Sequence, residues 1–553
     1  MGRVTRSEWR WVVAFTALVL ALSLLPYVLA YSSQGSAWRF SGFLLGVEDG
    51  NSYIAKMRLG SDGAWLYRLA YTTEPQSGAL VFLPYLLLGK LAARPALHEQ
   101  LIALYHLARL AASAALIAAT YLFLARFIPS IRLRRWGLVL AVLGGGLGWL
   151  ALAVGGGNGP MPLEYYSPES FGFLSLFALP HLAGARALLL LALLAYLNGA
   201  RGADTRGGWK AGLALVALWF LQPLNVPLAW GLMALAWGLT TARSLASRRR
   251  PASMEGATSV SAPEGSGRSL RSLAQAVLLP APLVLYSVIA FSTNPALRQW
   301  TAQNIITSPT AAEYLLGYGL LAPFALVGMV RAARSNEIGA NLLVAWVIAM
   351  PVLVSLPVNL QRRLAEGVWV ALIALAMIAF AAWDKGRALR RANLGSALLT
   401  ALALPSTVLL YGSALRAALR PADPVFIPAA EARAFEWLDA HATPGSIVLT
   451  NFTTGNALPA HAQVVPYIGH GPETLYVAAK RPQVAEFFSA SASRSARVAL
   501  LATSGADYVI LGPADALAAA PSGLLTLPGI ESRFTVDGWH VFVVLPVLPP
   551  CCG

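Results

Sequence analysis

The chain has 553 residues, of which 57% are hydrophobic and only 12% are charged, and its mean hydropathy is +0.60. Soluble domains average about 25% charged residues, so a wholly soluble protein is excluded and a membrane protein is expected. The net charge of +16 does not indicate a nucleic-acid partner, because the arginines gather in short stretches between apolar runs. The two cysteines, Cys551 and Cys552, are adjacent, which excludes a disulfide framework and a spaced set of metal-binding cysteines.

Eleven apolar segments are predicted to cross a hydrocarbon core roughly 30 Å thick as helices. They lie near residues 12–31, 100–125, 136–155, 179–198, 211–221, 226–240, 273–292, 314–331, 340–357, 366–383 and 393–416. The first is longer than the apolar core of a signal peptide, so we interpret it as an uncleaved span. The fifth and sixth are short, and Pro223 and Pro227 interrupt the helical pattern between them. This pair is either a helical hairpin or a re-entrant element.

Basic residues predict the topology, because short loops rich in Lys and Arg remain in the cytoplasm. Arginines in the N-terminal stretch and in the connections near residues 125–135, 201–210, 247–251, 331–335 and 384–391 place all of these inside. The apolar stretch at 79–93 would invert the later loops if it crossed, so we expect it to be juxtamembrane or re-entrant. The N-terminus is therefore cytoplasmic, and the long first loop, residues 32–99, lies outside.

The regions between and after the spans differ in composition. Residues 250–272 are rich in Ser, Gly, Pro and Ala and have little to bury, which predicts a disordered cytoplasmic loop. From about residue 424 the chain has ordinary polarity, with one helical pattern and the β-type runs SIVLT, YVILG and HVFVVLP. The predicted domains are therefore a transmembrane domain at 1–423 and a small extracytoplasmic α/β domain at 424–553.

An acidic pair opens a charged segment of the first external loop. Glu48 and Asp49 precede Tyr53 and Lys56 at helical spacing, so Asp49, Tyr53 and Lys56 share one face. Paired carboxylates suit general base catalysis, and one of them can also hold a divalent cation. The alternative is a solvated loop without chemistry.

The basic pair Arg362 and Arg363, in VNLQRRLAEG, is the exception to the predicted charge distribution because it lies outside. The planar guanidinium fork of arginine matches phosphate oxygens, so we expect these residues to bind an anion at the membrane surface. The alternative is that they extend to the phosphates of the outer leaflet and anchor a helix.

Further polar residues are predicted near the same outer level. His106 and Arg109 are three residues apart on one helix, His181 follows Pro180, and Glu164 and Glu169 occupy the loop before it. Ionisable groups at membrane depth are costly to place and indicate function, although each one alone is also compatible with a packed polar side chain.

The arrangement resembles the GT-C glycosyltransferases, multispanning enzymes that use polyprenyl-phosphate-linked sugars and include protein mannosyltransferases, aminoarabinose transferases and oligosaccharyltransferases. The matching features are the first span with its N-terminus inside, the acidic motif VEDGNSYIAKM in a large first external loop, about eleven spans and an external C-terminal domain. The stretch YIGHGPETLYVAAK also resembles a segment of bacterial membrane proteins of this group, with His470, Glu473 and Lys480 as its polar residues.

The resemblance implies a fold, a reaction and a set of site residues. The fold is a polytopic α-helical membrane protein with a small α/β domain, and the carboxylate that acts on the acceptor falls on Asp49, with Glu48 beside it. The residues expected to contact substrate are Arg362, Arg363, Tyr53, Lys56, His106, Arg109, His181, Glu169 and His470. The sequence contains no WWDYG-like motif, which favours transfer of a single sugar over en bloc transfer to asparagine.

The expected reaction is sugar transfer with inversion in the cell membrane, from a polyprenyl-phosphate donor to an extracytoplasmic glycan, lipid or protein acceptor. Membrane lipid is the other expected partner, and a divalent cation is the one candidate cofactor. The alternative function is a transporter or flippase for a lipid-linked or anionic substrate, in which the broken helix at LQPLNVP lines the path. The absence of an inverted repeat disfavours it.

Overall fold

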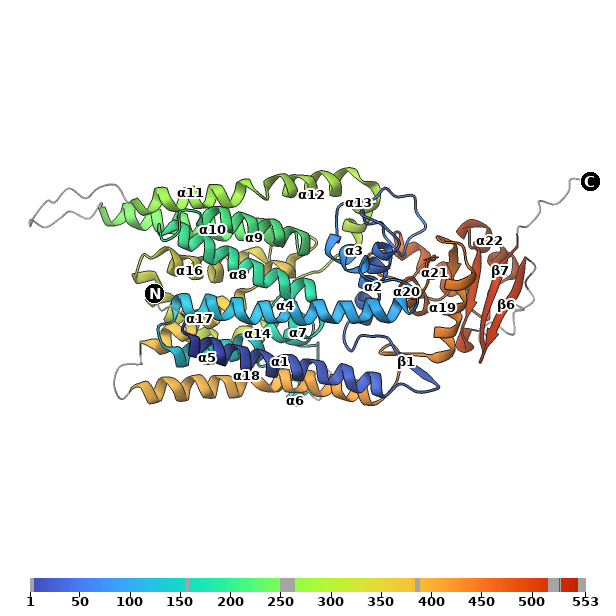
Figure 1. Ribbon diagram of the computed structural model, residues 1–553, viewed down its shortest axis with the longest axis horizontal. Helices are drawn as coiled ribbons and strands as arrows, with labels where there is room; N and C mark the ends of the chain where they lie inside the picture. The colour runs from blue at the N-terminus through green and yellow to red at the C-terminus, as the bar shows by residue number, and fades with distance from the viewer. Residues whose placement is uncertain are drawn as a thin grey trace, which may run out of the picture. The chain divides into compact units, whose positions relative to one another are not determined.

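The computed structural model describes residues 4–155, 159–248, 264–382, 388–515, 527 and 529–545 (Figure 1). The chain divides into two compact units. The first comprises residues 1–23, 107–288 and 306–413, and the second comprises residues 24–106, 289–305 and 414–553. Helices α1, α4, α12 and α18, whose bounds follow, have residues in both units.

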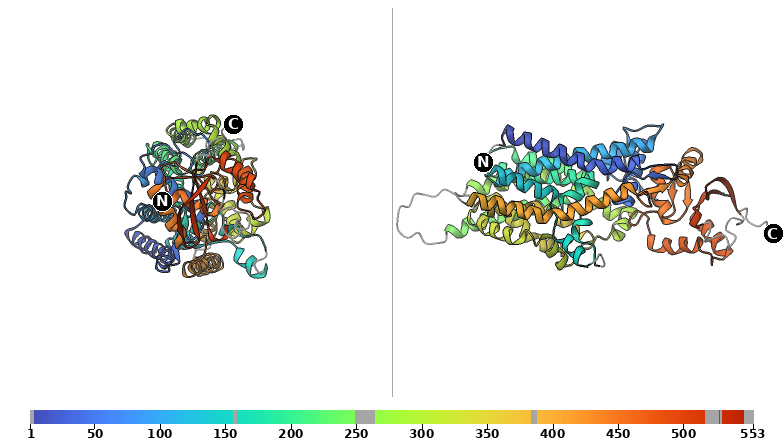
Figure 2. Two further views of the ribbon diagram at one scale, coloured as in Figure 1. Left: turned by 90° about the vertical axis from the view of Figure 1, so that its right-hand side faces the viewer. Right: turned by 90° about the horizontal axis from the view of Figure 1, so that it is seen from below.

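The regular elements described in the first unit are all helices. Its elements, including the four helices shared with the second unit, are α1 (Arg6–Ser32), α4 (Leu97–Phe127), α5 (Ile131–Leu143), α6 (Gly148–Gly155), η1 (Leu163–Tyr165), α7 (Gly172–Ala178), α8 (Pro180–Ala200), α9 (Gly207–Leu221), α10 (Asn225–Arg248), α11 (Glu264–Leu278), α12 (Ala281–Thr293), α14 (Ala311–Tyr318), α15 (Ala322–Arg334), α16 (Ile338–Leu353), η2 (Gln361–Ala365), α17 (Val368–Ala381) and α18 (Ala388–Leu419). Figure 2 shows α18 as an unbroken ribbon.

Candidate membrane spans are numerous among the described residues. Five helical segments are long and apolar enough to cross a membrane, and eight are found when each of three bent helix pairs counts as one span. Each of the eleven predicted apolar segments coincides with a helix or a bent pair, including the shorter helices α9 and α16 and the helix α10. The fold is therefore a polytopic helical one, and the count of eleven spans stays a prediction.

The predicted disorder of residues 250–272 does not extend to its last part. Residues 250–263 lie outside the described residues, but α11 begins at Glu264. Ser269 and Ser272 on this helix are buried, and the Ser272 hydroxyl donates to the Tyr196 carbonyl of α8 at 3.2 Å. Small side chains allow close helix–helix packing, so the composition that favours disorder in solution also suits a packed helix here.

The second unit carries the strands of the described chain. Its elements are β1 (Trp38–Phe40), α2 (Val47–Ser61), α3 (Leu83–Gly89), α13 (Pro295–Gln303), β2 (Phe426–Pro428), α19 (Ala429–His441), β3 (Ile447–Leu449), α20 (Phe452–His461), β4 (Val465–Pro466), α21 (Val477–Phe487), α22 (Arg494–Ser504), β5 (Tyr508–Leu511), β6 (Ile530–Val536) and β7 (Trp539–Val544). Strand β1 pairs antiparallel with β2, which joins the start of the loop at residues 32–99 to the C-terminal segment.

A five-stranded mixed sheet has the order β4-β3-β5-β7-β6, with β3 parallel to β4 and β5 and with β7 antiparallel to β5 and β6. Successive residues of a strand point to opposite faces of the sheet, and the central strand β5 is buried on both. Val509 and Leu511 join a cluster with residues of α21 and α22, whereas Ile510 joins a second cluster with residues of α19 and α20. The C-terminal segment is therefore an α/β sandwich of three layers, and its place outside the cytoplasm stays a prediction.

Helices α2 and α3 pack at unusually close range. A Cβ at Gly60 would lie 2.0 Å from the Leu86 carbonyl oxygen, so only glycine allows this approach. Met57, Ile54 and Tyr85 complete the apolar contact between these helices. The stretch at 79–93, predicted to be juxtamembrane or re-entrant, contains α3. Its packing holds one side of α2, the helix that carries the acidic pair.

Candidate active site

Helix α2 presents the acidic pair at its N-terminus. The chain enters through Gly46 in the left-handed region at φ 61°, so the helix begins at Val47 with Glu48 and Asp49 in its first turn. The positive end of the helix dipole favours carboxylates there. Both residues are exposed, and the Asp49 side chain is 62% accessible, whereas most residues from Gly50 onward are buried. Asp49 is therefore open to a substrate and held by a fixed backbone.

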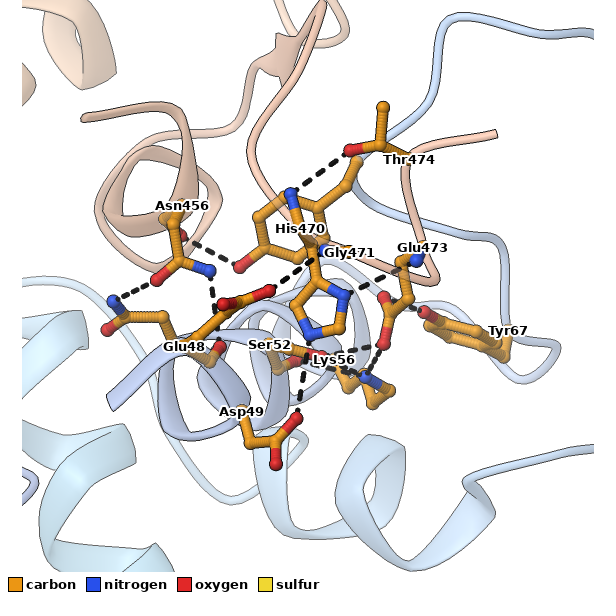
Figure 3. Close-up of polar contacts among 12 residues, drawn as sticks. Glu48, Asp49, Ser52, Lys56, Tyr67, Asn456, His470, Gly471, Glu473 and Thr474 are labelled. Atoms are coloured by element: carbon orange, nitrogen blue, oxygen red, sulfur yellow. Dashed lines mark hydrogen bonds and ion pairs between the residues drawn. The ribbon is translucent and has the colours of Figure 1, made fainter. Parts of the chain in front are cut away.

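The loop at 469–474 lies against this turn of α2 (Figure 3). The Gly471 amide donates to Oε1 of Glu48 at 2.8 Å. The amide nitrogen of Asn456, on α20, donates to the Glu48 carbonyl at 3.2 Å, while the oxygen of the same side chain accepts from Asn51 at 2.8 Å. A Cβ at Gly469 would lie 2.4 Å from the Gly455 backbone, so glycine is required for the loop to follow this path.

His470 extends from this loop toward Asp49 (Figure 3). Its Nδ1 accepts a hydrogen bond from the Glu473 amide at 3.3 Å, so the neutral ring carries its proton on Nε2. Nε2 lies 3.6 Å from Oδ1 of Asp49. The ring is buried and rests against Tyr71 at 5.2 Å between centroids. His470 thus lies in one cluster with Asp49 and Glu48, and its contact with substrate stays a prediction.

A buried ion pair lies beneath the site. Oε1 of Glu473 accepts from Lys56 at 2.5 Å and from Ser52 at 2.7 Å, and its Oε2 accepts from Tyr67 at 2.6 Å. Burial alone would raise the pKa of Glu473, but the charge of the Lys56 ammonium and the hydrogen bonds from Lys56 and Tyr67 bring it below its usual value. Lys56 was expected to contact substrate; with a 1% exposed side chain and a carboxylate partner, it instead connects α2 to the 469–474 loop.

The predicted basic pair, Arg362 and Arg363, lies beside one carboxylate in the first unit. Nε of Arg362 lies 3.6 Å from Oε2 of Glu169, and Nε of Arg363 lies 3.7 Å from Oε1. Glu169 is buried, whereas the arginine side chains are 18% and 27% exposed. Both Nε atoms are buried without a hydrogen-bond partner among the described residues. Two guanidinium groups share one carboxylate, which leaves one positive charge uncompensated within this cluster.

His106 and Arg109, predicted to share a face of α4, have protein partners. A ring nitrogen of His106 lies 2.9 Å from the Gly42 carbonyl oxygen, and the residue is buried in the second unit. Arg109 is fully buried in the first unit and donates to the carbonyl of Phe177 at 3.1 Å and to Ser23 at 3.3 Å. These contacts explain both residues as packed polar groups, and substrate contact by either one stays a prediction.

The remaining predicted residues are dispersed. His181 is partly buried in the first turn of α8. Tyr53 stacks on Tyr85 with ring centroids 4.8 Å apart, so its ring is part of the packing around α2. Glu164 accepts from the Gly148 amide at 2.7 Å, at the beginning of α6. None of these contacts indicates that a ligand binds there.

Four polar residues of the site were not predicted as site residues. The sequence marks Glu473 only as a polar residue of its segment, and it does not mark Ser52, Tyr67 or Asn456 as site residues. The sequence carries one signal for Glu473, which follows His470 at a spacing of three. Local sequence carries no signal for the others, because Ser52 meets Glu473 and Asn456 meets Asn51 across more than 400 positions of the chain.

The donor groups around Asp49 decide whether a divalent cation fits there. Within the described ranges, no three His, Cys, Asp or Glu side chains are grouped to hold a metal ion. His470 uses the Nδ1 lone pair to accept from Glu473 and carries its proton on the nitrogen that faces Asp49. A metal ligand needs a free lone pair at that position, so the donor set does not fit a cation between these two residues.

Solved structures with the same fold are polytopic membrane enzymes. Over 98% of its length the chain is similar to the apo oligosaccharyltransferase of Archaeoglobus fulgidus, with 14% identity, a TM-score of 0.51 and 75% of that chain covered. Over 96% it is similar to the arabinofuranosyltransferase AftD from Mycobacteria, with 16% identity, a TM-score of 0.59 and 40% of that chain covered. Over 96% it is also similar to apo ArnT from Cupriavidus metallidurans, with 14% identity, a TM-score of 0.52 and 98% of that chain covered.

The chain has the GT-C glycosyltransferase fold. This confirms the resemblance predicted from the sequence. No protein-family model matches the sequence, and no curated protein is similar to it. At 14–16% identity the likeness concerns the fold, so activity has to be argued from the residues of this chain.

Proposed function

We propose that this chain is an integral membrane glycosyltransferase that moves one sugar from a polyprenyl-phosphate donor to an extracytoplasmic acceptor with inversion. The GT-C fold and the candidate spans support a membrane glycosyltransferase. The observation that carries the proposal is the Asp49 carboxylate, which is exposed at the N-terminus of α2 and faces a buried histidine.

In the proposed reaction, Asp49 is the general base. A hydroxyl of the acceptor gives its proton to the carboxylate while its oxygen attacks the anomeric carbon of the donor sugar. The bond from that carbon to the phosphate oxygen breaks, and the phosphate leaves with the electron pair. A single displacement of this kind inverts the anomeric configuration. Glu48 has a supporting role, because one of its oxygens is already occupied by the Gly471 amide.

Arg362 and Arg363 are proposed to bind the phosphate of the donor. Their shared carboxylate, Glu169, neutralises one of the two guanidinium charges and leaves the other for an anion. The unpartnered Nε atoms are donors that a phosphate oxygen would satisfy. Such contacts speed the reaction to the extent that they strengthen as the phosphate gains charge in the transition state.

The proposal is tested by a transfer assay with membranes that contain or lack the protein. Polyprenyl-phosphate donors carrying different radiolabelled hexoses and pentoses are supplied with lipid, glycan and peptide acceptors, and the labelled products are separated. The proposal predicts label in an acceptor only where the protein and a cognate donor are present. Movement of the lipid-linked sugar across the bilayer without formation of a new glycosidic bond would contradict it and would support the transporter.

A further inference from the structure

We propose that His470 is the positioning residue of the catalytic carboxylate. Its Nε2–H holds Oδ1 of Asp49, which directs Oδ2 toward the acceptor hydroxyl. The inference rests on the proposed function, in which Asp49 is the base, and it replaces direct substrate contact as the role of His470.

The imidazole ring is fixed before any substrate arrives. The Glu473 amide donates to Nδ1, and the Thr474 hydroxyl accepts from the His470 backbone amide at 3.0 Å. The ring of Tyr71 lies against the imidazole, and the Tyr71 hydroxyl donates to the Asn456 carbonyl at 2.9 Å. Backbone and aromatic contacts therefore hold the ring, while the Asp49 side chain is exposed and gains its orientation from the histidine.

The nitrogen that faces Asp49 needs an acceptor. Nε2 of His470 is buried, and the described residues offer it no partner within hydrogen-bond distance. An unsatisfied buried donor costs about 1–3 kcal/mol. Oδ1 of Asp49 lies 3.6 Å away, which is beyond a normal hydrogen bond. A small rotation of the exposed carboxylate closes that distance, and catalytic hydrogen bonds commonly tighten in this way when substrate binds.

The other charged groups close to the pair have partners of their own. Glu48 lies on the same turn of α2 and is bound to the Gly471 amide. Glu473 is paired with Lys56, so the two charges beneath the ring offset one another. Burial and the charges of the nearby carboxylates raise the pKa of Tyr71 well above its ordinary value, so this hydroxyl stays neutral.

The test compares His470→Ala with His470→Gln in the purified full-length protein. Alanine removes the donor, whereas the glutamine amide can restore it. His441→Ala is the matched control, because His441 is an exposed histidine at the end of α19 whose ring contacts Trp437 of its own helix. The readouts are kcat and KM for donor and acceptor and the pH profile of kcat/KM, with Asp49→Asn assayed in parallel.

For His470→Ala we expect kcat to fall about 10- to 100-fold, because a misplacement near 1 Å costs about that much, while the donor KM is unchanged. We also expect the acidic limb of the kcat/KM profile to move to higher pH, because a donor to a carboxylate favours its charged form. Glutamine should recover most of kcat and return the limb toward its original position. His441→Ala should behave as the unaltered protein does.

Each outcome bears on the inference. An unaltered acidic limb in His470→Ala, or equal losses in His470→Ala and His470→Gln, would overturn it, since a residue that only supports the loop would not move the limb. If Asp49→Asn keeps full activity, the proposed function itself fails and the positioning role falls with it. If Asp49→Asn is inactive while His470→Ala is unaffected, the proposed function stands and only the positioning role is lost.

Discussion

Removing the carboxylate of Glu473 leaves the Lys56 ammonium buried without its partner. Lys56 is 1% exposed, and Glu473 is its carboxylate partner at 2.5 Å. Breaking a buried pair by removing one member costs about 3–5 kcal/mol, whereas replacing both members by apolar residues is often neutral. We therefore expect Glu473→Leu to lower the free energy of unfolding by about 3–5 kcal/mol, and Lys56→Met with Glu473→Leu to recover most of that loss.

The measurement is a double-mutant cycle by chemical denaturation of the detergent-solubilised protein, followed by tryptophan fluorescence. The matched control is the ion pair of Lys480 and Glu74, 3.0 Å apart in the same unit, where the Glu74 side chain is 34% exposed. That pair should couple by less than about 1 kcal/mol. Additive effects of Lys56→Met and Glu473→Leu would refute the reasoning, because they would mean that the two charges do not stabilise one another.

The same cycle has a pH dependence of known sign. The pKa of Glu473 is lowered in the folded protein, so its contribution is present above the pKa of the unfolded chain and is lost as the pH falls through the folded value. Glu473→Leu should therefore differ most from the unaltered protein at neutral pH and least in acid.

Three further predictions concern other parts of the chain. Burial raises the pKa of Glu431 from 4.5 to about 7. The protonated carboxyl therefore contributes stability that is present below pH 4.5 and is lost as the pH rises through 7. Glu431→Gln should stabilise the protein at pH 8 by up to about 3 kcal/mol in the same denaturation assay. Replacing Arg362 and Arg363 by Gln should raise the donor KM about 10-fold or more, and Lys at both positions should do less harm because it keeps the charge; equal KM values in all three proteins would leave only an anchoring role. In a chain without its native cysteines, Gly35→Cys and Ala440→Cys, both at exposed positions, should react with an impermeant thiol reagent on intact cells, and protection of either one would contradict the topology.

The helices could be predicted from the sequence because their signal is local. A run of apolar residues about 20 long identifies a span without reference to the rest of the chain, and every predicted segment coincides with a helix or a bent pair. Three strands of the C-terminal segment were also recognisable: β3 and β5 lie within the predicted β-type runs, and β7 overlaps the third run but begins one residue before it, at Trp539. Helix α11 was missed over residues 264–272 because its stability comes from packing on α8, which composition does not reveal.

The site could be predicted only in part, for a physical reason. Glu48 and Asp49 were identified from charge in an otherwise apolar chain, but their contacts, of Glu48 with Gly471 and of Asp49 with His470, join segments more than 400 residues apart. Lys56 was interpreted as a substrate ligand because a sequence shows that a residue is charged and does not show that it is buried beside Glu473. Local patterns therefore find the carboxylates, and only the fold supplies their partners.

The most direct test of the central claim is transfer activity of Asp49→Asn beside Glu48→Gln, with Asp62→Asn as the control. Asp62 is exposed at the C-terminal end of the same helix. Asparagine keeps the shape of residue 49 and removes the base, and general base catalysis contributes about 10² to 10⁴ in rate. The account predicts a loss of that size in kcat for Asp49→Asn, a smaller loss for Glu48→Gln and none for Asp62→Asn, at equal protein levels. Near-normal transfer by Asp49→Asn with loss of activity in Glu48→Gln would move the base by one residue, and full activity in both variants would contradict the account.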